Sequence, residues 1–438
     1  MNTVCLHNRY DWIRTSGDVL HLSDVYVCTC GSQPRSLAWA PLQCADMRMR
    51  VSAHTLSPDD WQRIEAVITE LHAQGQVDRF ARSHQAVFRQ VHGQAAFFPF
   101  HRRFVIEFED LGRQIDPEFT IPYWDTTLDA RNPAPAPYCV TKPWAATAKA
   151  PMAAYSAGAR MNPWTPAEII TSYIQTNNRL SRFRENIEFS IHGATHLGLG
   201  GDAATMFAPN DFFFFMHHAN LDRLWWIWQN NQDAMFDYNG PGPNGEATLD
   251  DIIPQNRMLS FGGERVEDVM VLGYGNVCYI YDSAPRAPGS YPSQRNIDDF
   301  DESLPGRVIH GSEPVSRLPM FSGSSDLAGR GLEITRIHKA LGENSDLQAF
   351  FPQVASMEPS RLEVAMAAGA GAATAAVSVG SSRAMGKCGQ RKRIIYPARM
   401  SNAWIKMHGF DIERVEQVHR EACRLIDLLN NSTYVSPY

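Results

Sequence analysis

The stretch "FFPFHRRFVIEFED", residues 97–110, places one histidine inside an aromatic run that is otherwise typical of buried protein. Phenylalanines stand on both sides of His101, at positions 97, 98, 100, 104 and 108. A buried polar ring without a partner costs on the order of 1–3 kcal/mol of folding free energy. We therefore expect the imidazole of His101 to have a partner.

The chain around this stretch is patterned mainly as helices. Residues 57–73 begin with a serine cap, a proline and two aspartates, and then carry apolar residues at helical spacing. Proline-rich residues 131–144 are typical of a loop. Further helices are expected over residues 77–91, about 99–111, and within 165–196 and 210–231. The core is therefore predicted to be mainly helical.

The pattern changes after Tyr238. Residues 239–251 are rich in turn formers, and residues 266–282 suggest a short strand that closes the core. Residues 366–382 are a low-complexity Ala/Gly/Ser linker, and residues 400–429 predict a terminal helix. Its apolar stripe is Ile412, Val415, Ala422, Leu425 and Leu429. We divide the chain into an N-terminal segment (1–50), a core (51–282) and a C-terminal extension (283–438).

Composition narrows the class of protein. The chain has 438 residues, 20% of them charged, and a net charge of −7, so neither nucleic acid nor an anionic membrane is an expected partner. No apolar run reaches the roughly 20 residues that span a bilayer. The N-terminus does not resemble a secretory signal, although an incomplete N-terminus would give the same result, so cytoplasmic and secreted locations both stay open. The oligomeric state is also open.

Cysteine usage leaves the redox compartment open too. Four of the eight cysteines, Cys5, Cys28, Cys30 and Cys44, lie before residue 50. They could form local disulfides in an exported protein or stay reduced in a cytosolic one.

Six of the fifteen histidines form two groups on predicted helices. His192 and His196 are four residues apart, which places both rings on one helix face, and His218 on another helix can complete a three-nitrogen site. Two such sites facing each other across a helix bundle make a binuclear centre. All-imidazole ligation suits copper, zinc, iron or nickel. The groups are His84, His92 and His101, and His192, His196 and His218.

The residues around these histidines narrow the choice of metal. "HGQAAFFPFHRRFVIEFE" and "NDFFFFMHHANLDRLWWIWQ" resemble the two copper-binding signatures of the tyrosinase, catechol oxidase and mollusc-type hemocyanin superfamily. The resemblance extends over about residues 50–282. It implies a helix bundle that holds two copper ions, with short strands. It also implies that the first histidine group binds one copper ion and the second group binds the other.

Several histidines compete with these assignments or fall outside them. His72 is the alternative to His84, and His217 lies next to His218, but in the family pattern the second histidine of that pair binds metal. Other histidines are interpreted as ordinary core residues: His54, His310, His338, His408 and His419.

The resemblance also suggests residues that tune the chemistry. Glu188 lies four residues before His192, and in plant relatives a glutamate at that position helps hold a water near the coppers. An asparagine after the corresponding histidine completes this arrangement in strong monophenol hydroxylases, and here that position is Gly193. We therefore expect oxidation of diphenols to be favoured. Asp125 and Asp222 are candidates to orient the ligands from behind.

By resemblance, the expected activity is copper-dependent oxidation of phenols or o-diphenols to o-quinones, with a small phenol and dioxygen as partners. A hemocyanin-like oxygen carrier is a different class, and it is disfavoured because carriers in the superfamily join several similar units whereas this chain shows one pair of signatures. An o-aminophenol oxidase is a third possibility. In related enzymes a C-terminal region covers the copper pocket until it is cleaved, and residues from about 283 onward could do the same.

Overall fold

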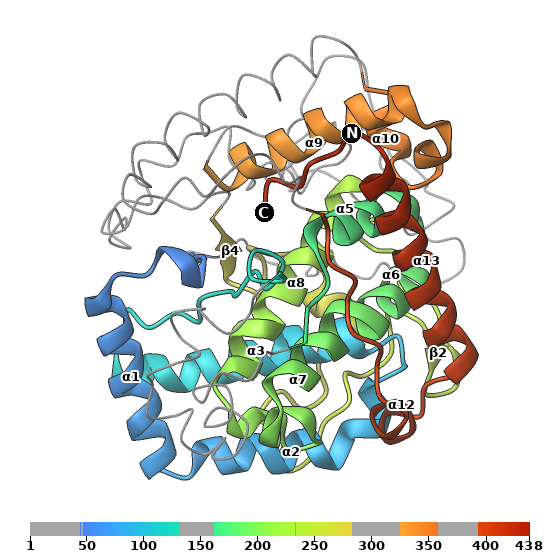
Figure 1. Ribbon diagram of the computed structural model, residues 1–438. Coiled ribbons are helices and arrows are strands. Elements are labelled where there is room, and N and C mark those ends of the chain that lie inside the picture. Colours follow the sequence, from blue (N-terminus) through green and yellow to red (C-terminus); the bar gives the residue numbers. More distant parts are fainter. Residues whose placement is uncertain (1–43, 45–46, 132–161, 233, 283–324, 358–392) are drawn as a thin grey trace, which may run out of the picture.

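The helical core predicted from the sequence is present in the structure, a computed structural model shown in Figure 1. The structure describes residues 44, 47–131, 162–232, 234–282, 325–357 and 393–438. The predicted linker at 366–382, most of the proline-rich segment, His310 and three of the N-terminal cysteines lie outside these residues. Among the described residues, no helix is both long and apolar enough to cross a membrane.

Three helices make up the first part of the core: α1 (Pro58–Ala73), α2 (Gln76–Val91) and α3 (Phe97–Ile115). Ser57 caps α1 as predicted, because its side chain accepts from the Asp60 N–H while the Asp60 carboxylate accepts from the Ser57 N–H. Helix α3 is longer than the predicted 99–111, since its aromatic residues are buried along most of its length. It packs against α1, α2 and α8 (Phe213–Asn231).

The second part of the core is an interrupted run of helices. It comprises α5 (Ala167–Thr176), α6 (Leu180–Ile187), the π-helical turn η4 (Glu188–His192) and α7 (Gly193–Leu199). Single π-turns inside helices are rare and are frequent at functional sites. Short 3₁₀ turns connect the other elements: η2 (Ala53–Thr55), η5 (Gly201–Ala204), η6 (Ala208–Asn210) and η7 (Val266–Val269).

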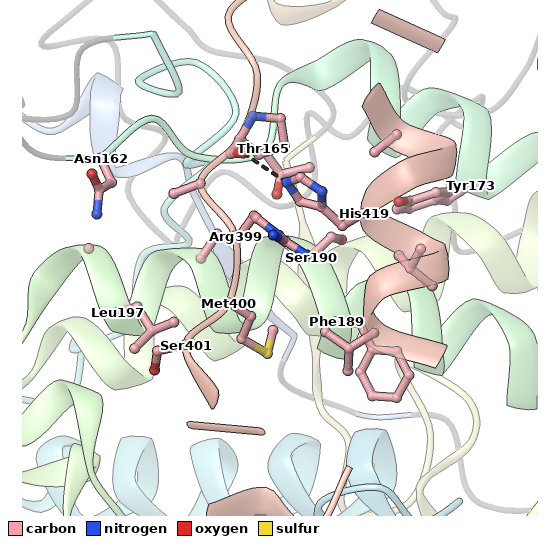
Figure 2. Close-up of a pocket in the computed structure, with 17 residues that line it drawn as sticks. Asn162, Thr165, Tyr173, Phe189, Ser190, Leu197, Arg399, Met400, Ser401 and His419 are labelled. Atoms are coloured by element: carbon pink, nitrogen blue, oxygen red, sulfur yellow. Dashed lines mark hydrogen bonds between the residues drawn. The ribbon is translucent and has the colours of Figure 1, made fainter. Parts of the chain in front are cut away.

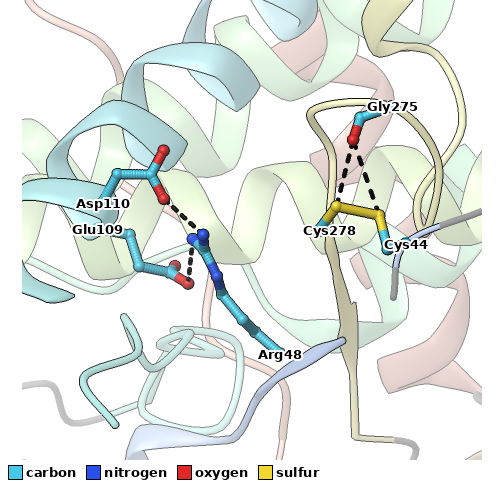
Figure 3. The surroundings of a disulfide bond; sticks show 6 residues. All are labelled: Cys44, Arg48, Glu109, Asp110, Gly275 and Cys278. Carbon is cyan, nitrogen blue, oxygen red and sulfur yellow. Dashed lines mark hydrogen bonds and ion pairs between the residues drawn. A yellow bond between two sulfur atoms is a disulfide. The ribbon is translucent and has the colours of Figure 1, made fainter. Parts of the chain in front are cut away.

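Two short strand pairs accompany the helices. The predicted strand is β4 (Tyr279–Tyr281), which pairs in parallel with β1 (Arg48–Arg50). A small hairpin joins β2 (Pro241–Gly242) to β3 (Gly245–Glu246). Beside the first pair, Cys44 forms a disulfide with Cys278, 234 residues away in sequence (Figure 3). Cys44 is therefore not part of a local N-terminal disulfide, and the end of the N-terminal segment is tied to the core.

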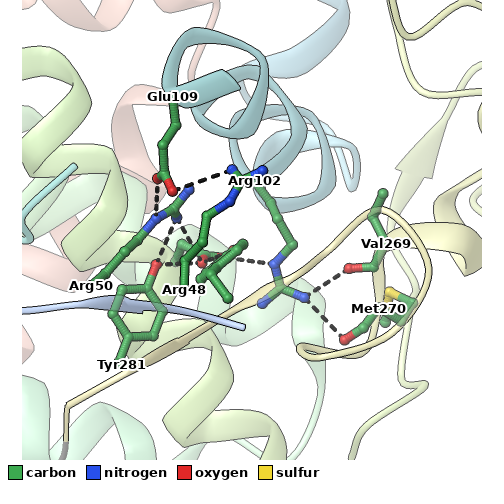
Figure 4. Close-up of polar contacts among 9 residues, drawn as sticks. Arg48, Arg50, Arg102, Glu109, Val269, Met270 and Tyr281 are labelled. Atoms are coloured by element: carbon green, nitrogen blue, oxygen red, sulfur yellow. Dashed lines mark hydrogen bonds and ion pairs between the residues drawn. The ribbon is translucent and has the colours of Figure 1, made fainter. Parts of the chain in front are cut away.

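A buried ionic network fixes β1 and β4 against the helices (Figure 4). The Arg50 Nε–H donates to Glu109 Oε2 at 2.7 Å, and the Arg102 guanidinium donates to the carbonyls of Val269 and Met270. Since a buried charge is costly without a partner, each pairing restricts how these elements can pack. The network therefore holds α3, which carries His101, in one position.

The described parts of the C-terminal extension, residues 325–357 and 393–438, pack onto the core and contribute to the same hydrophobic cluster. Its elements are α9 (Ser325–Glu343), η11 (Ser345–Ala349), α10 (Pro352–Ala355), α12 (Asn402–His408) and α13 (Ile412–Asn431). Helix α13 lies against α5 and η4 (Figure 1).

The predicted terminal helix is two helices. Gly409 has φ +71°, a conformation that ends α12, and Asp411 then caps α13 by accepting from the Arg414 N–H. Ile412 was predicted in the apolar stripe but is 50% exposed, because it lies in the first turn of α13, whereas Val415 and the later members of the stripe are buried.

Candidate metal centre

The first histidine group comes from α2 and α3. His84 lies in α2, His92 directly follows the last residue of α2, and His101 lies one turn into α3. Each is at most 3% exposed, and one ring nitrogen from each lies within 4.8 Å of the other two. His84, and not the competing His72, completes this group.

The second group comes from η4, α7 and α8. His192 is the last residue of the π-turn, His196 follows in α7, and His218 lies in α8. Their ring nitrogens also lie within 4.8 Å of one another, and all three rings are buried. The neighbouring His217 is buried as well but is not a member of this triad.

The two triads face each other. The rings of His101 and His218 stack with centroids 4.1 Å apart, and those of His92 and His192 stack at 5.6 Å. The six predicted ligands therefore form one continuous imidazole cluster between the two halves of the core.

Hydrogen bonds fix which nitrogen of several rings is free to bind. The Nδ1 atoms of His84, His92, His101 and His196 lie 2.7–3.0 Å from backbone carbonyl oxygens. Because a carbonyl can only accept, Nδ1 must carry the proton, which leaves the Nε2 lone pair available. The Nε2 atoms of His84 and His101 are buried without a hydrogen-bond partner. Metal-ligating histidines commonly show this arrangement.

The second triad also has the spacing that a shared metal ion requires. His196 Nε2 lies 3.4 Å from His218 Nε2. Two nitrogens that each lie about 2.0 Å from one tetrahedral ion would be about 3.3 Å apart. The donor set therefore fits a metal ion in each triad, and the distance between His196 and His218 matches two ligands on one shared ion.

Burial keeps these imidazoles neutral. It lowers the pKa of His84 to about 4 and that of His196 to about 3, and it lowers those of His92, His101, His192 and His218 well below the ordinary value. A metal binds the unprotonated imidazole, so near neutral pH the cluster is already in its binding form.

Glu188 links the two halves of the centre. Its buried carboxylate pairs with Arg184 one turn earlier and accepts the Gly93 N–H at 3.0 Å, directly after His92. Burial raises the pKa of Glu188 to about 7, against the opposing effect of the Arg184 charge. Sequence reasoning identified Glu188 but not Arg184, although an arginine four residues before a buried glutamate could have indicated the pair.

Asp125 and Asp222, which the sequence suggested as groups that orient the ligand imidazoles, contact other residues. Asp222 accepts hydrogen bonds from Arg102, Tyr279 and Tyr281. Asp125 accepts from Thr127 and lies 3.6 Å from Arg223. For four of the ligands the orienting group is a backbone carbonyl instead. For His92 and His101 it lies one helical turn earlier in the chain, whereas for His84 it belongs to Met206 and for His196 to Ala203.

The C-terminal helix α12 covers the centre. The Trp404 ring stacks near His196 with centroids 5.5 Å apart, and the His408 ring lies 4.9 Å from that of His92. A Cβ atom added at Gly193 would lie 2.3 Å from Met400 Cε and 3.1 Å from Trp404 Nε1. His408, which the sequence suggested as an ordinary core residue, is buried as expected, and its neighbours include the candidate ligands His92 and His192.

A cavity of about 170 Å³ lies on the other face of the same helical run (Figure 2). Ser190, Ala194 and Leu197 line it from η4 and α7, and the chain at 397–401 closes it. These three residues are on the opposite helix face from His192 and His196. His419, labelled in Figure 2, has its Nε2 atom 3.2 Å from the carbonyl oxygen of Pro397. The C-terminal extension therefore encloses this helical run on both faces.

Comparisons with known proteins agree with this geometry. A family model described as the common central domain of tyrosinase matches residues 68–159 and 141–231, which contain all six histidines. The chain is 30% identical over 227 residues to the tyrosinase of Streptomyces glaucescens, covering 42% of this chain and 83% of that relative. It is 29% identical over 272 residues to the tyrosinase-like protein tyr-3 of Caenorhabditis elegans, covering 54% of this chain but 39% of that protein.

Among solved structures, a mutant polyphenol oxidase from Thermothelomyces thermophila shares 18% sequence identity with a TM-score of 0.42, covering 54% of this chain and 88% of that chain. At this level of similarity the solved structure decides neither fold nor activity. The family model and the sequence relatives carry the assignment: the chain belongs to the tyrosinase family of oxidoreductases.

Proposed function

We propose that each histidine triad holds one copper ion and that the chain oxidises phenols or o-diphenols to o-quinones with dioxygen. The observation that carries the proposal is the pair of facing, buried triads within the tyrosinase-type domain. His84, His92 and His101 would hold one ion, and His192, His196 and His218 the other. When bound, the copper pair supplies the activation of dioxygen and accepts electrons from the phenol.

The chain's own residues supply geometry and a dry site. Carbonyl contacts to Nδ1 fix the ring orientations, and the bond from the Gly93 N–H to Glu188 holds the loop after His92 against the second triad. The surrounding aromatic residues, such as Phe97 and Phe214, are buried and exclude water from the imidazoles. A preorganised site of this kind does not have to reorganise when substrate arrives.

We also propose a bias towards diphenols. A monophenol must lose its proton before it is hydroxylated, whereas a catechol is more acidic and chelating. Gly193 cannot supply a side-chain amide, and the Glu188 carboxylate is already engaged by Arg184 and the Gly93 N–H. Both features support weak activation of a base-like water.

The proposal is tested by copper analysis and oxygen uptake on the purified chain. We expect copper near two per chain and continuous oxygen consumption with 4-tert-butylcatechol. His101→Ala is the matched negative variant, because it removes one ligand and leaves the second triad intact. Reversible oxygen binding without catechol turnover would instead support the carrier. Turnover of o-aminophenols in place of catechols would support the third possibility.

A further inference from the structure

His408 shows the same hydrogen-bond arrangement as the candidate ligands. Its Nδ1 lies 3.0 Å from the carbonyl of Trp404, one helical turn earlier, just as the Nδ1 atoms of His92 and His101 contact the carbonyls one turn before them. The carbonyl must accept, so Nδ1 carries the proton and the Nε2 lone pair is bare. That Nε2 is buried and has no hydrogen-bond partner.

The His408 ring lies beside both triads, although its nitrogens are not among those that lie within 4.8 Å of one another in either triad. Its ring centroid lies 4.9 Å from that of His92, whereas the centroids of His84 and His92, which share a triad, are 5.1 Å apart. The ring of His192, in the other triad, is 6.0 Å away. His408 is 3% exposed. A bare, buried nitrogen lone pair in this place costs free energy unless something binds it.

We propose that His408 is a seventh metal-binding imidazole, contributed by the C-terminal segment, which holds α12 closed over the centre when copper is bound. This inference rests on the proposed copper binding at the two triads. A side chain that only filled space could not bind the metal, because coordination requires a nitrogen lone pair.

Copper binding and closure of α12 affect each other equally. If copper favours the closed position of α12 by some factor, closing α12 must raise the affinity for copper by the same factor. Arg89 and Gly93 contact the same segment: the Arg89 guanidinium donates to the Lys406 carbonyl, and Phe410 packs on Gly93. These contacts already hold α12 against the core, so a bond from copper to His408 would stabilise that position further.

The experiment measures hydrogen–deuterium exchange of the peptide covering residues 400–410 in the full chain, metal-free and after loading with copper(II). We expect loading to slow this exchange by about tenfold, within the usual range of coupling between two sites. His408→Phe keeps an aromatic ring between Phe88, Trp404 and Phe410 but has no lone pair. In that variant, exchange should not respond to copper, and copper affinity measured by chelator competition should fall by the same factor.

Lys406→Ala is the control, since its side chain is exposed on the same helix and it should keep the response to copper. Equal slowing in wild type and His408→Phe would overturn the inference and make α12 a steric cover only. If copper does not slow the exchange of residues 400–410 in the wild-type chain, this result alone also overturns the inference. If the wild type binds copper and oxidises catechol yet shows either result, this inference alone fails. If it binds no copper, the proposed function fails as well.

Discussion

Substituting asparagine for Gly193 changes two things at once. The new Cβ would lie 2.3 Å from Met400 Cε and 3.1 Å from Trp404 Nε1. Both contacts belong to the C-terminal segment, so the steric cost falls on the closed form alone. Overpacking of this kind costs about 1–3 kcal/mol. The closed form should therefore become about 5- to 150-fold less favoured, towards the lower end because the Met400 side chain is flexible.

The amide is the second change. If it helps hold a base-like water, monophenol oxidation should rise relative to diphenol oxidation by about tenfold, or about 1.4 kcal/mol in the barrier, which is the size of one hydrogen bond. Gly193→Ala separates the two effects, because alanine introduces the same Cβ without the amide. The backbone at Gly193 is ordinary right-handed helix, φ −66°, so either side chain fits the chain locally.

The assay is oxygen uptake with tyrosol, a monophenol, and hydroxytyrosol, the corresponding diphenol, with copper content measured on each preparation. We expect Gly193→Ala to raise both rates together and Gly193→Asn to raise the tyrosol rate further. Equal ratios of the two rates in both variants would show that pocket shape, and not water activation, decides the substrate. Unchanged rates and stability in Gly193→Ala would refute the steric reasoning.

Four further outcomes are expected. His101→Ala should abolish oxidase activity and lower copper content measured by elemental analysis, whereas His217→Ala should be much milder; an active His101→Ala chain would contradict the ligand assignment. Glu188→Gln should lower monophenol oxidation. It should also lower the unfolding free energy measured in urea by about 1–3 kcal/mol, because a neutral amide replaces the nearer carboxylate of the buried Arg184 while Glu185 stays 3.9 Å from the same guanidinium. Burial lowers the pKa of His84 from 6.5 to about 4, so below pH 6.5 the unfolded chain binds more protons than the folded chain. The free energy of unfolding of the metal-free protein should therefore fall by about 3 kcal/mol through this residue as the pH is lowered to 4. The measurement is the urea midpoint at each pH, and a midpoint that does not change with pH would contradict this. Protease cleavage within residues 366–382 should raise turnover of catechol, and equal rates before and after cleavage would show that the C-terminal extension is not a lid.

Local patterns were enough to predict much of the core. The cap at Ser57 and the apolar spacing after it fixed the start of α1, and the four-residue step from His192 to His196 predicted two rings on one face. Both signals act over one or two helical turns, so they do not depend on the rest of the chain. The π-turn at η4, which ends at His192, has no comparable local signature, because it depends on how α6 and α7 pack.

Long-range partners were the part that only the tertiary structure decided. The sequence predicted the two histidine groups that the structure also brings together, but it could not place His408, which is 190 positions beyond His218 in the chain and lies against His92 in space. Cys44 likewise pairs with Cys278, and Asp222 binds Arg102 and two tyrosines rather than a histidine. Such contacts depend on which buried surfaces meet. Because many distant residues have suitable chemistry, the sequence alone does not indicate which of them becomes the partner. Residue type, spacing and the family resemblance therefore predicted which histidines gather at the candidate metal centre, and packing determined what orients their rings and what covers them.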